Sequence, residues 1–114
     1  MDLKIDEVMN HIRTHYARVH SVREVAADGF GQNYEIFRKE FRRVVGTSPM
    51  KFLRQVRAEH AKDLLRNTTL KHYAIGREVG YKNEVTFCRF FKREAGMTPK
   101  AYRQSNGQDS DKQP

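Results

Sequence analysis

Apolar positions along the chain recur at intervals of three and four residues rather than in alternation. Ile5, Val8, Ile12 and Tyr16 form the first such series, which has the spacing of one side of an α-helix. No segment of four or more residues alternates convincingly between apolar and polar positions, as a half-buried strand would. The pattern predicts an all-α fold of about seven helices, over residues 5–17, 21–27, 33–45, 49–66, 69–79, 83–95 and 99–103.

Residues that favour helix ends lie between these segments. Ser21 and Glu24 form a capping box at the start of the second helix. Thr69 is expected to cap the fifth helix. Two similar stop signals, at residues 46–49 and 96–99, combine a glycine with a proline three positions later. Each signal ends one helix and places the proline in the first turn of the next.

The chain contains an internal repeat. A shift of about 50 residues superimposes two segments, each made of a short helix, a glycine turn and a second helix. In each copy a small residue, Ala27 or Gly76, comes four positions before the turn glycine, Gly31 or Gly80. Helices that cross steeply need a small side chain at their closest approach, and the turn needs a residue that tolerates positive φ. The repeat predicts two helix-turn-helix units, residues 1–48 and 67–103, joined by a connecting helix at 49–66 and followed by a flexible tail at 104–114.

The second helix of each copy has an aromatic face and an opposite, largely basic face. The aromatic face is expected to join the core through Phe37, Phe41 and Val44 in the first copy and Phe87, Phe91 and Ala95 in the second. The other face would point away from the core, where a helix-turn-helix unit presents its recognition helix to the major groove. Its residues are Glu35, Arg38, Lys39 and Arg42 in the first copy and Val85, Cys88, Arg89 and Lys92 in the second.

The chain has a net charge of +8, which favours binding to a polyanion. Residues 21–103 carry 18 basic and 9 acidic side chains, so the excess lies in the helical repeat rather than in a terminal arm. One basic helix face alone would be read as solvated surface, but two matching copies favour binding to nucleic acid. The chain lacks a signal-peptide pattern and an apolar run of membrane-spanning length, so a cytoplasmic, nucleoid-associated protein without membrane contact is expected.

Enzymatic chemistry finds little support in the sequence. His11 and His15 are four residues apart on one predicted helix, but no third convergent metal ligand is evident. A single cysteine, Cys88, excludes an internal disulfide and has no identified base partner. The sequence therefore predicts no catalytic residue, no metal site and no cofactor. Three alternatives stay open: a sequence-independent architectural DNA-binding protein, a protein-interaction module built on a helix-turn-helix body, and a redox switch at Cys88.

The second copy carries a family resemblance. Residues 75–81, 87–99 and 102–103, together with Arg57 and its apolar neighbours on the connecting helix, resemble the DNA-binding domain of the AraC/XylS family of bacterial transcription regulators. The resemblance covers roughly residues 5–103. The chain departs from the family pattern at several positions: Glu40 and His72 replace apolar residues, Cys88 stands where serine is common, and Tyr73 and Gly76 also differ.

The resemblance implies a sequence-specific regulator of double-stranded DNA, of activating type, that contacts RNA polymerase. Its two recognition helices would enter successive major grooves. The 18 residues of the connecting helix span about 27 Å at about 1.5 Å per residue. Once the helix-turn-helix units add their own width, this length is of the right order for grooves about 34 Å apart. As a separate protein the chain would be a monomer, and as part of a longer regulator it could dimerise. Arg57 is expected to form an internal ion pair or hydrogen bond rather than to touch DNA.

The family pattern also implies which side chains touch which part of the DNA. Base edges would be contacted by Glu35, Arg38, Lys39, Glu84, Val85, Cys88 and Arg89. Phosphates would be contacted by Asn33, Arg42, Arg43, Asn83, Lys92 and Arg93. For Asn33 and Asn83 plain N-capping is an alternative role, and Glu35 and Glu84 could instead stabilise the starts of their helices.

Overall fold

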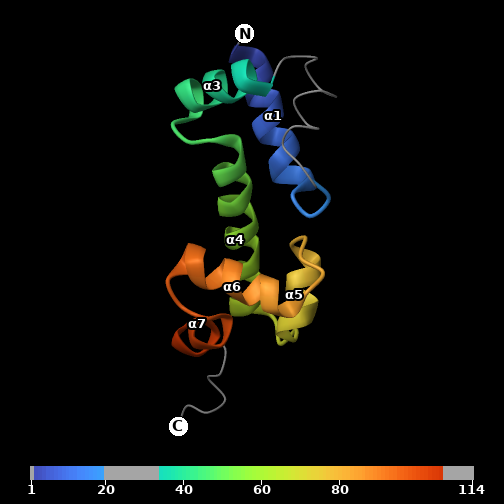
Figure 1. Cartoon of the computed structure of the whole chain (residues 1–114). Coiled ribbons are helices and arrows are strands. Elements are labelled where there is room, and N and C mark those ends of the chain that lie inside the picture. The colour runs from blue at the N-terminus through green and yellow to red at the C-terminus, as the bar shows by residue number, and fades with distance from the viewer. Residues whose placement is uncertain (1, 20–33, 107–114) are drawn as a thin grey trace. The chain divides into compact units, whose positions relative to one another are not determined.

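The computed structural model describes residues 2–19 and 34–106 of the chain. These ranges contain helices, turns and connecting segments but no strand, which confirms the predicted all-α fold. The six helices within them are α1 (Asp2–His15), α3 (Tyr34–Val45), α4 (Pro49–Asn67), α5 (His72–Glu78), α6 (Glu84–Ala95) and α7 (Pro99–Ser105) (Figure 1). The predicted helix at 21–27, with Ala27, Gly31 and Asn33, lies outside the described residues. Among the described helices, none is both long and apolar enough to cross a bilayer.

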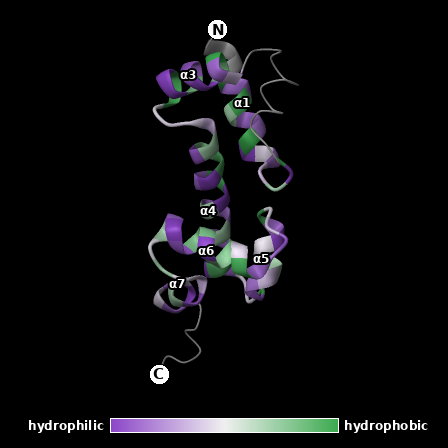
Figure 2. Cartoon of the chain, viewed as in Figure 1, coloured by the Kyte–Doolittle hydropathy of each residue, from purple (hydrophilic) through white to green (hydrophobic). Residues whose placement is uncertain are grey.

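The chain divides into two compact units, Met1–Val56 and Arg57–Pro114, with the boundary inside α4. In the first unit the apolar side of α1 packs against α3, so the predicted helical series does form a core. Phe41 lies at its centre and is fully buried, with ring centroids 5.9 Å from Phe37 and 5.7 Å from Phe52 of α4. The other buried members are Ile5, Val8, Ile12, Val19 and Leu53. Figure 2 shows the matching hydrophobic and hydrophilic bands along α1 and α3.

One member of the predicted aromatic face is misplaced. The sequence predicts that Val44 joins Phe37 and Phe41 in the core, but Val44 is exposed and Val45 packs against the core instead. The chain turns at Gly46, which has φ +94°, and enters the segment of α4 that brings Phe52 against Phe41. The core at this end of α3 therefore lies on the side of Val45.

In the second unit α5 and α6 form a helix-turn-helix motif. Figure 1 shows α5 beside the start of α6 and α7 beside its end, and both pairs are in contact. Gly76 is buried at the crossing of α5 and α6, where a Cβ would stand 3.0 Å from the Cβ of Phe87. Gly80 forms the turn with φ +110°, a left-handed conformation that side chains disfavour. The roles predicted for these two glycines from their spacing are confirmed.

The core of this unit is aliphatic on α5 and aromatic on α6. Ile75, Val79, Phe87 and Phe91 have no exposed surface. Phe91 meets the ring of Tyr102 on α7 edge to face, at 5.5 Å between centroids. The hydroxyl of Tyr102 in turn accepts a hydrogen bond from Nη1 of Arg66, at 2.6 Å. These contacts pack α7 against the end of α6 and against α4.

The start of α5 differs from its prediction. Thr69 does not cap this helix, which begins at His72 after Lys71. The reason lies in Arg103, far along the chain on α7. Its guanidinium donates to the carbonyls of Leu65, Thr68 and Leu70 at 3.2, 3.1 and 2.9 Å. Because these contacts hold the segment between α4 and α5 outside a helix, α5 starts three residues later than expected.

The end of α7 also differs from its prediction. The helix starts at Pro99, where Thr98 Oγ1 accepts a hydrogen bond from the Ala101 N–H at 3.1 Å. It continues to Ser105 instead of ending at Arg103, so the predicted tail at 104–114 begins too early. The Asn106 side chain donates to the carbonyl of Tyr102 at 2.8 Å, which stabilises the added turn. Residues 107–114 lie outside the described part of the chain.

Candidate nucleic-acid interface

The second helix of the helix-turn-helix motif in this unit is α6. It begins at Glu84, directly after Asn83, whose side-chain oxygen accepts a hydrogen bond from the Thr86 N–H at 3.1 Å, so the predicted N-cap is confirmed. It ends at Gly96, which has φ +83°. The aromatic side chains of Phe87, Phe90 and Phe91 are buried on one side of the helix. This packing fixes which side of α6 faces solvent.

The exposed side of α6 gathers most of the residues predicted for it. Glu84, Val85, Cys88 and Arg89 share one face because they lie at intervals of one and four residues. Together with Lys92 and Thr98 they line a single open depression in the surface. The structure therefore brings together all four base-contact residues predicted for the second copy. Val85 is 58% exposed and adds an apolar side chain to this otherwise polar face.

Cys88 lies half-buried on this face. Burial raises the pKa of its thiol, and the negative charge of Glu84 raises it further. The thiol is therefore protonated at neutral pH, unlike the low-pKa cysteines that act as nucleophiles or as redox sensors. This environment argues against the redox switch that the sequence left open.

The equivalent helix of the first unit is α3. Its exposed side carries the residues predicted for the first copy, but two of its arginines are paired with carboxylates. Arg38 donates to Glu35 at 2.9 Å, and this hydrogen bond together with the charge of Glu35 raises the pKa of the guanidinium. Arg43 pairs with Glu40, a residue that also departs from the family pattern. Such exposed ion pairs are weak because water screens them, so a stronger anion can displace the carboxylates.

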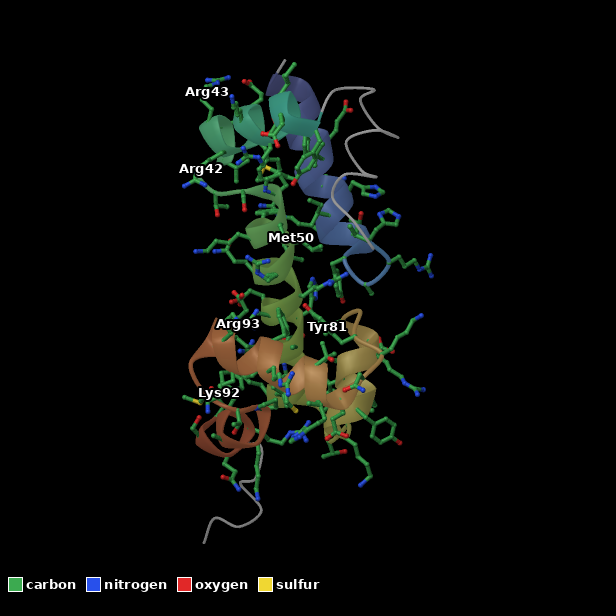
Figure 3. The ribbon with its side chains drawn as sticks, in the orientation of Figure 1. Arg42, Arg43, Met50, Tyr81, Lys92 and Arg93 are labelled. Carbon is green, nitrogen blue, oxygen red and sulfur yellow. The ribbon has the colours of Figure 1, made fainter. Side chains whose placement is uncertain are left out.

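The basic residues at the ends of both helices occupy matching positions. Arg42 and Arg43 project from the C-terminal part of α3, and Lys92 and Arg93 project from the corresponding part of α6 (Figure 3). All four residues are exposed. Asn33, predicted to act with them, lies outside the described residues.

Arg57 lies against the turn of the second unit, where its guanidinium contacts an aromatic ring. The guanidinium carbon lies 5.2 Å from the ring centroid of Tyr81, in the turn that follows α5. Its tip would also lie within 3.0 Å of a Cβ placed on Gly80. Arg57 thus supports the turn of the second helix-turn-helix motif.

Ile36 is a surface residue that the sequence analysis missed. It is 62% exposed on α3, beside Glu35. The signal was present in the spacing, because Ile36 is offset by one position from the buried row of Phe37 and Phe41. Ile36 therefore adds an exposed apolar side chain to the surface of α3 beside the predicted contact residues.

Comparison with known proteins places these features in a family. A family model described as a helix-turn-helix domain matches residues 26–105. The chain belongs to the AraC/XylS family of helix-turn-helix domains. The resemblance based on the second copy is thereby confirmed, and the chain is an AraC-type DNA-binding domain.

The relatives of this AraC-type domain include both sequences and solved structures. The HTH-type transcriptional activator RhaR of Escherichia coli is 38% identical over 73 residues, which are 64% of this chain and 26% of RhaR. The C-terminal domain of the response regulator yesN from Fusobacterium nucleatum is 30% identical, with a TM-score of 0.80 over 86% of this chain and 95% of that domain. The DNA-binding domain of AdpA in complex with a target DNA has a TM-score of 0.84 at 23% identity, over 95% and 96% of the two chains, and so shares the fold.

The AraC-type domain is short beside its full-length relatives. It spans about a quarter of the length of the curated proteins it matches. The match covers 23% of an uncharacterized HTH-type transcriptional regulator of Haemophilus influenzae and 26% of RhaR. Those proteins are named as transcriptional regulators.

Proposed function

We propose that this chain is a sequence-specific regulator of double-stranded DNA, of activating type, in which α3 and α6 each enter a major groove. The observation that carries the proposal is the exposed face of α6. Arg89, Lys92 and an exposed Val85 gather there, opposite a buried aromatic row, in a domain of AraC type. The name of its relative RhaR, a transcriptional activator, supports the activating role.

The side chains of α6 divide by their chemistry. Arg89 donates to O6 and N7 of guanine, and Val85 packs against the methyl group of thymine. Glu84 and Cys88 lie beside them and contact neighbouring base edges. Lys92 and Arg93 contact phosphates, which position the helix without reading the sequence. Asn83, whose side-chain oxygen caps α6, donates from its amide nitrogen to a phosphate as well.

The side chains of α3 contact DNA in the same way, once its arginines exchange their carboxylate partners for DNA. Lys39 is exposed and donates to a guanine. Arg38 leaves its ion pair with Glu35 when it meets a base, and Glu35 then accepts from N4 of cytosine. Arg42 and Arg43 contact phosphates together with Asn33, and Ile36 adds an apolar contact with a thymine methyl.

The regulator acts as part of the transcription apparatus in the cytoplasm. The two recognition helices bind successive major grooves, as the repeat in the sequence predicts, and a surface of the chain contacts RNA polymerase. Any effector domain of a longer regulator would control this binding.

Selection of bound duplexes from a random DNA library tests the proposal. The purified chain is expected to enrich a motif with two blocks about ten base pairs apart, centre to centre. The selected duplex should then bind about 10³-fold or more tightly than random duplex at physiological salt. An affinity ratio near one, with steep loss of binding as salt increases, would instead identify an architectural DNA-binding protein.

A further inference from the structure

Three side chains of different ligand chemistry meet where α5 and α6 adjoin. His72 is the first residue of α5, Glu84 is the first residue of α6, and Cys88 follows Glu84 one turn later. One ligand atom from each, an imidazole nitrogen, a carboxylate oxygen and the thiol sulfur, lies within 4.8 Å of the other two. Glu84 and Cys88 share a helix face because they are four residues apart. The third ligand comes from another helix, 12 residues earlier in the chain than Glu84.

We propose that His72, Glu84 and Cys88 form a site for a thiophilic divalent cation such as Zn²⁺. Imidazole nitrogen, thiolate sulfur and carboxylate oxygen are the three donor types that zinc accepts in proteins. Magnesium and calcium prefer all-oxygen sites, so a thiol and an imidazole at the centre select against them. Three protein ligands leave the fourth tetrahedral position to water.

The geometry requires only a modest contraction. Zinc–ligand bonds of about 2.0–2.3 Å place tetrahedral ligands about 3.3–3.8 Å apart. The three atoms must therefore approach by roughly 1 Å, which rotation of the exposed Glu84 and the half-buried His72 side chains supplies. Within the described part of the chain no hydrogen bond engages any of the three side chains, so the contraction breaks none there. On binding, the S–H bond of Cys88 breaks, an S–metal bond forms, and the proton passes to solvent.

Two of the three ligands are residues at which the sequence departs from the family that it resembles. His72 and Cys88 are both departures from the AraC/XylS pattern, in which an apolar residue and a serine are usual. They are separated by a helix and a turn in the chain, yet their ligand atoms meet in the structure.

The site overlaps the proposed DNA surface, and this consequence rests on the proposed function. Glu84 and Cys88 line the depression on the recognition face of α6. A metal ion that holds both of them withdraws their side chains from the bases. Metal binding and base contact should therefore compete, so that the metal weakens specific DNA binding.

Titration of the metal-free full chain with Co²⁺ tests the site without using DNA. The expected result is one Co²⁺ per chain, with a near-ultraviolet charge-transfer band from the thiolate. Cys88→Ser should abolish this band, and His72→Leu and Glu84→Gln should each weaken binding at least tenfold. The matched control is the double variant His11→Ala/His15→Ala, which removes the exposed histidine pair whose rings stack at 4.4 Å on α1. This control should bind Co²⁺ as the parent chain does.

Two results would overturn the site: the parent chain shows no charge-transfer band, or the band persists unchanged in His72→Leu and Glu84→Gln. Thermal melting in metal-free buffer establishes that each variant folds. If His72→Leu is unfolded, Glu84→Gln decides alone, because Glu84 is exposed and its substitution leaves the core intact.

DNA binding with and without Zn²⁺ tests the consequence separately. Zn²⁺ should lower the affinity of the parent chain for its selected duplex at least tenfold and leave His72→Leu unaffected. A charge-transfer band without specific DNA binding would retain the metal site and reject the proposed function. Specific DNA binding without the band would retain the proposed function and reject the metal site. Equal Zn²⁺ effects in both chains would reject the competition.

Discussion

Gly76 of α5 and Phe87 of α6 lie so close that a Cβ added to Gly76 would stand 3.0 Å from the Cβ of Phe87 and 3.1 Å from its Cγ. Phe87 is fully buried, and its Cβ is attached directly to the backbone of α6. The Cβ of Phe87 therefore cannot rotate away, and relief of the contact requires movement of α6 as a whole. The crossing of the two helices, and hence the face that α6 presents, depends on the absence of a side chain at residue 76.

Substitution of Gly76 should destabilise the second unit in proportion to side-chain size. Gly76→Val is expected to lower the free energy of unfolding by about 1–3 kcal/mol, the usual cost of overpacking. Gly76→Ala should cost less, because alanine gains about 1 kcal/mol of helix propensity over glycine. Tyr73→Val, on the exposed side of the same helix, serves as the control for a β-branched residue in α5. Urea denaturation measures all three, and an equal loss in Gly76→Val and Tyr73→Val would contradict the close approach.

Gly80 and Gly96 provide a matched pair of left-handed glycines. Both have positive φ, but a Cβ at Gly80 would lie 3.0 Å from the guanidinium of Arg57, whereas Gly96 has open space around it. Alanine at either position should cost about 1–2 kcal/mol for the strained backbone. Gly80→Ala should cost a further ~0.5–1 kcal/mol, because the displaced guanidinium loses its position over Tyr81.

A double-mutant cycle isolates that second cost. In the background of Arg57→Ala the difference between Gly80→Ala and Gly96→Ala should vanish, because no guanidinium remains to be displaced. Thermal or urea unfolding of Gly80→Ala and Gly96→Ala, each with Arg57 present and with Arg57→Ala, gives the coupling energy. A difference that survives the loss of Arg57 would assign the extra cost to the backbone rather than to Arg57.

Local spacing predicted the features of the fold that local sequence controls. The small residue and the turn glycine, four positions apart, placed the crossing of α5 and α6, and Asn83 was correctly predicted to cap α6. The start of α5 could not be predicted in this way. It depends on Arg103, which lies more than 30 residues from the carbonyls of Leu65 and Thr68 that it binds.

The two candidate sites also differ in whether local sequence or helix packing determines them. The face of α6 follows from the helical repeat, so its residues were predicted together and are found together. The cluster of His72, Glu84 and Cys88 depends on how two helices pack, which a helical repeat does not specify. The sequence marked His72 and Cys88 only as departures from the family pattern, and their proximity emerged from the packing of α5 against α6.

Arg103 should be a major determinant of stability although it lies near the end of the last helix. Arg103→Ala removes three hydrogen bonds from a charged donor to partly buried or exposed carbonyls, and we expect a loss on the order of 2–4 kcal/mol. Arg103→Lys should recover only part of this loss, since an ammonium lacks the planar fork of the guanidinium. The control is Arg93→Ala, an exposed arginine on α6, which should change unfolding by less than about 0.5 kcal/mol. Equal denaturation midpoints for the two alanine variants would show that the carbonyl contacts contribute little.

Arg89 and Arg93 should separate the reading of bases from the binding of phosphates. Both are exposed arginines on α6, four residues apart, but only Arg89 lines the depression with Val85 and Cys88. Arg89→Ala should reduce the binding free energy by about 1–3 kcal/mol on the selected duplex. On a duplex changed at the base pair that Arg89 contacts the loss should be much smaller, so the preference at that pair is relaxed. Arg93→Ala should weaken binding to all duplexes alike and reduce the slope of log affinity against log salt by about one. Binding isotherms at several salt concentrations, on the selected duplex and its single-pair variants, measure both quantities. If the two variants lost affinity uniformly across all duplexes, Arg89 would be a phosphate contact and the division of roles along α6 would be wrong.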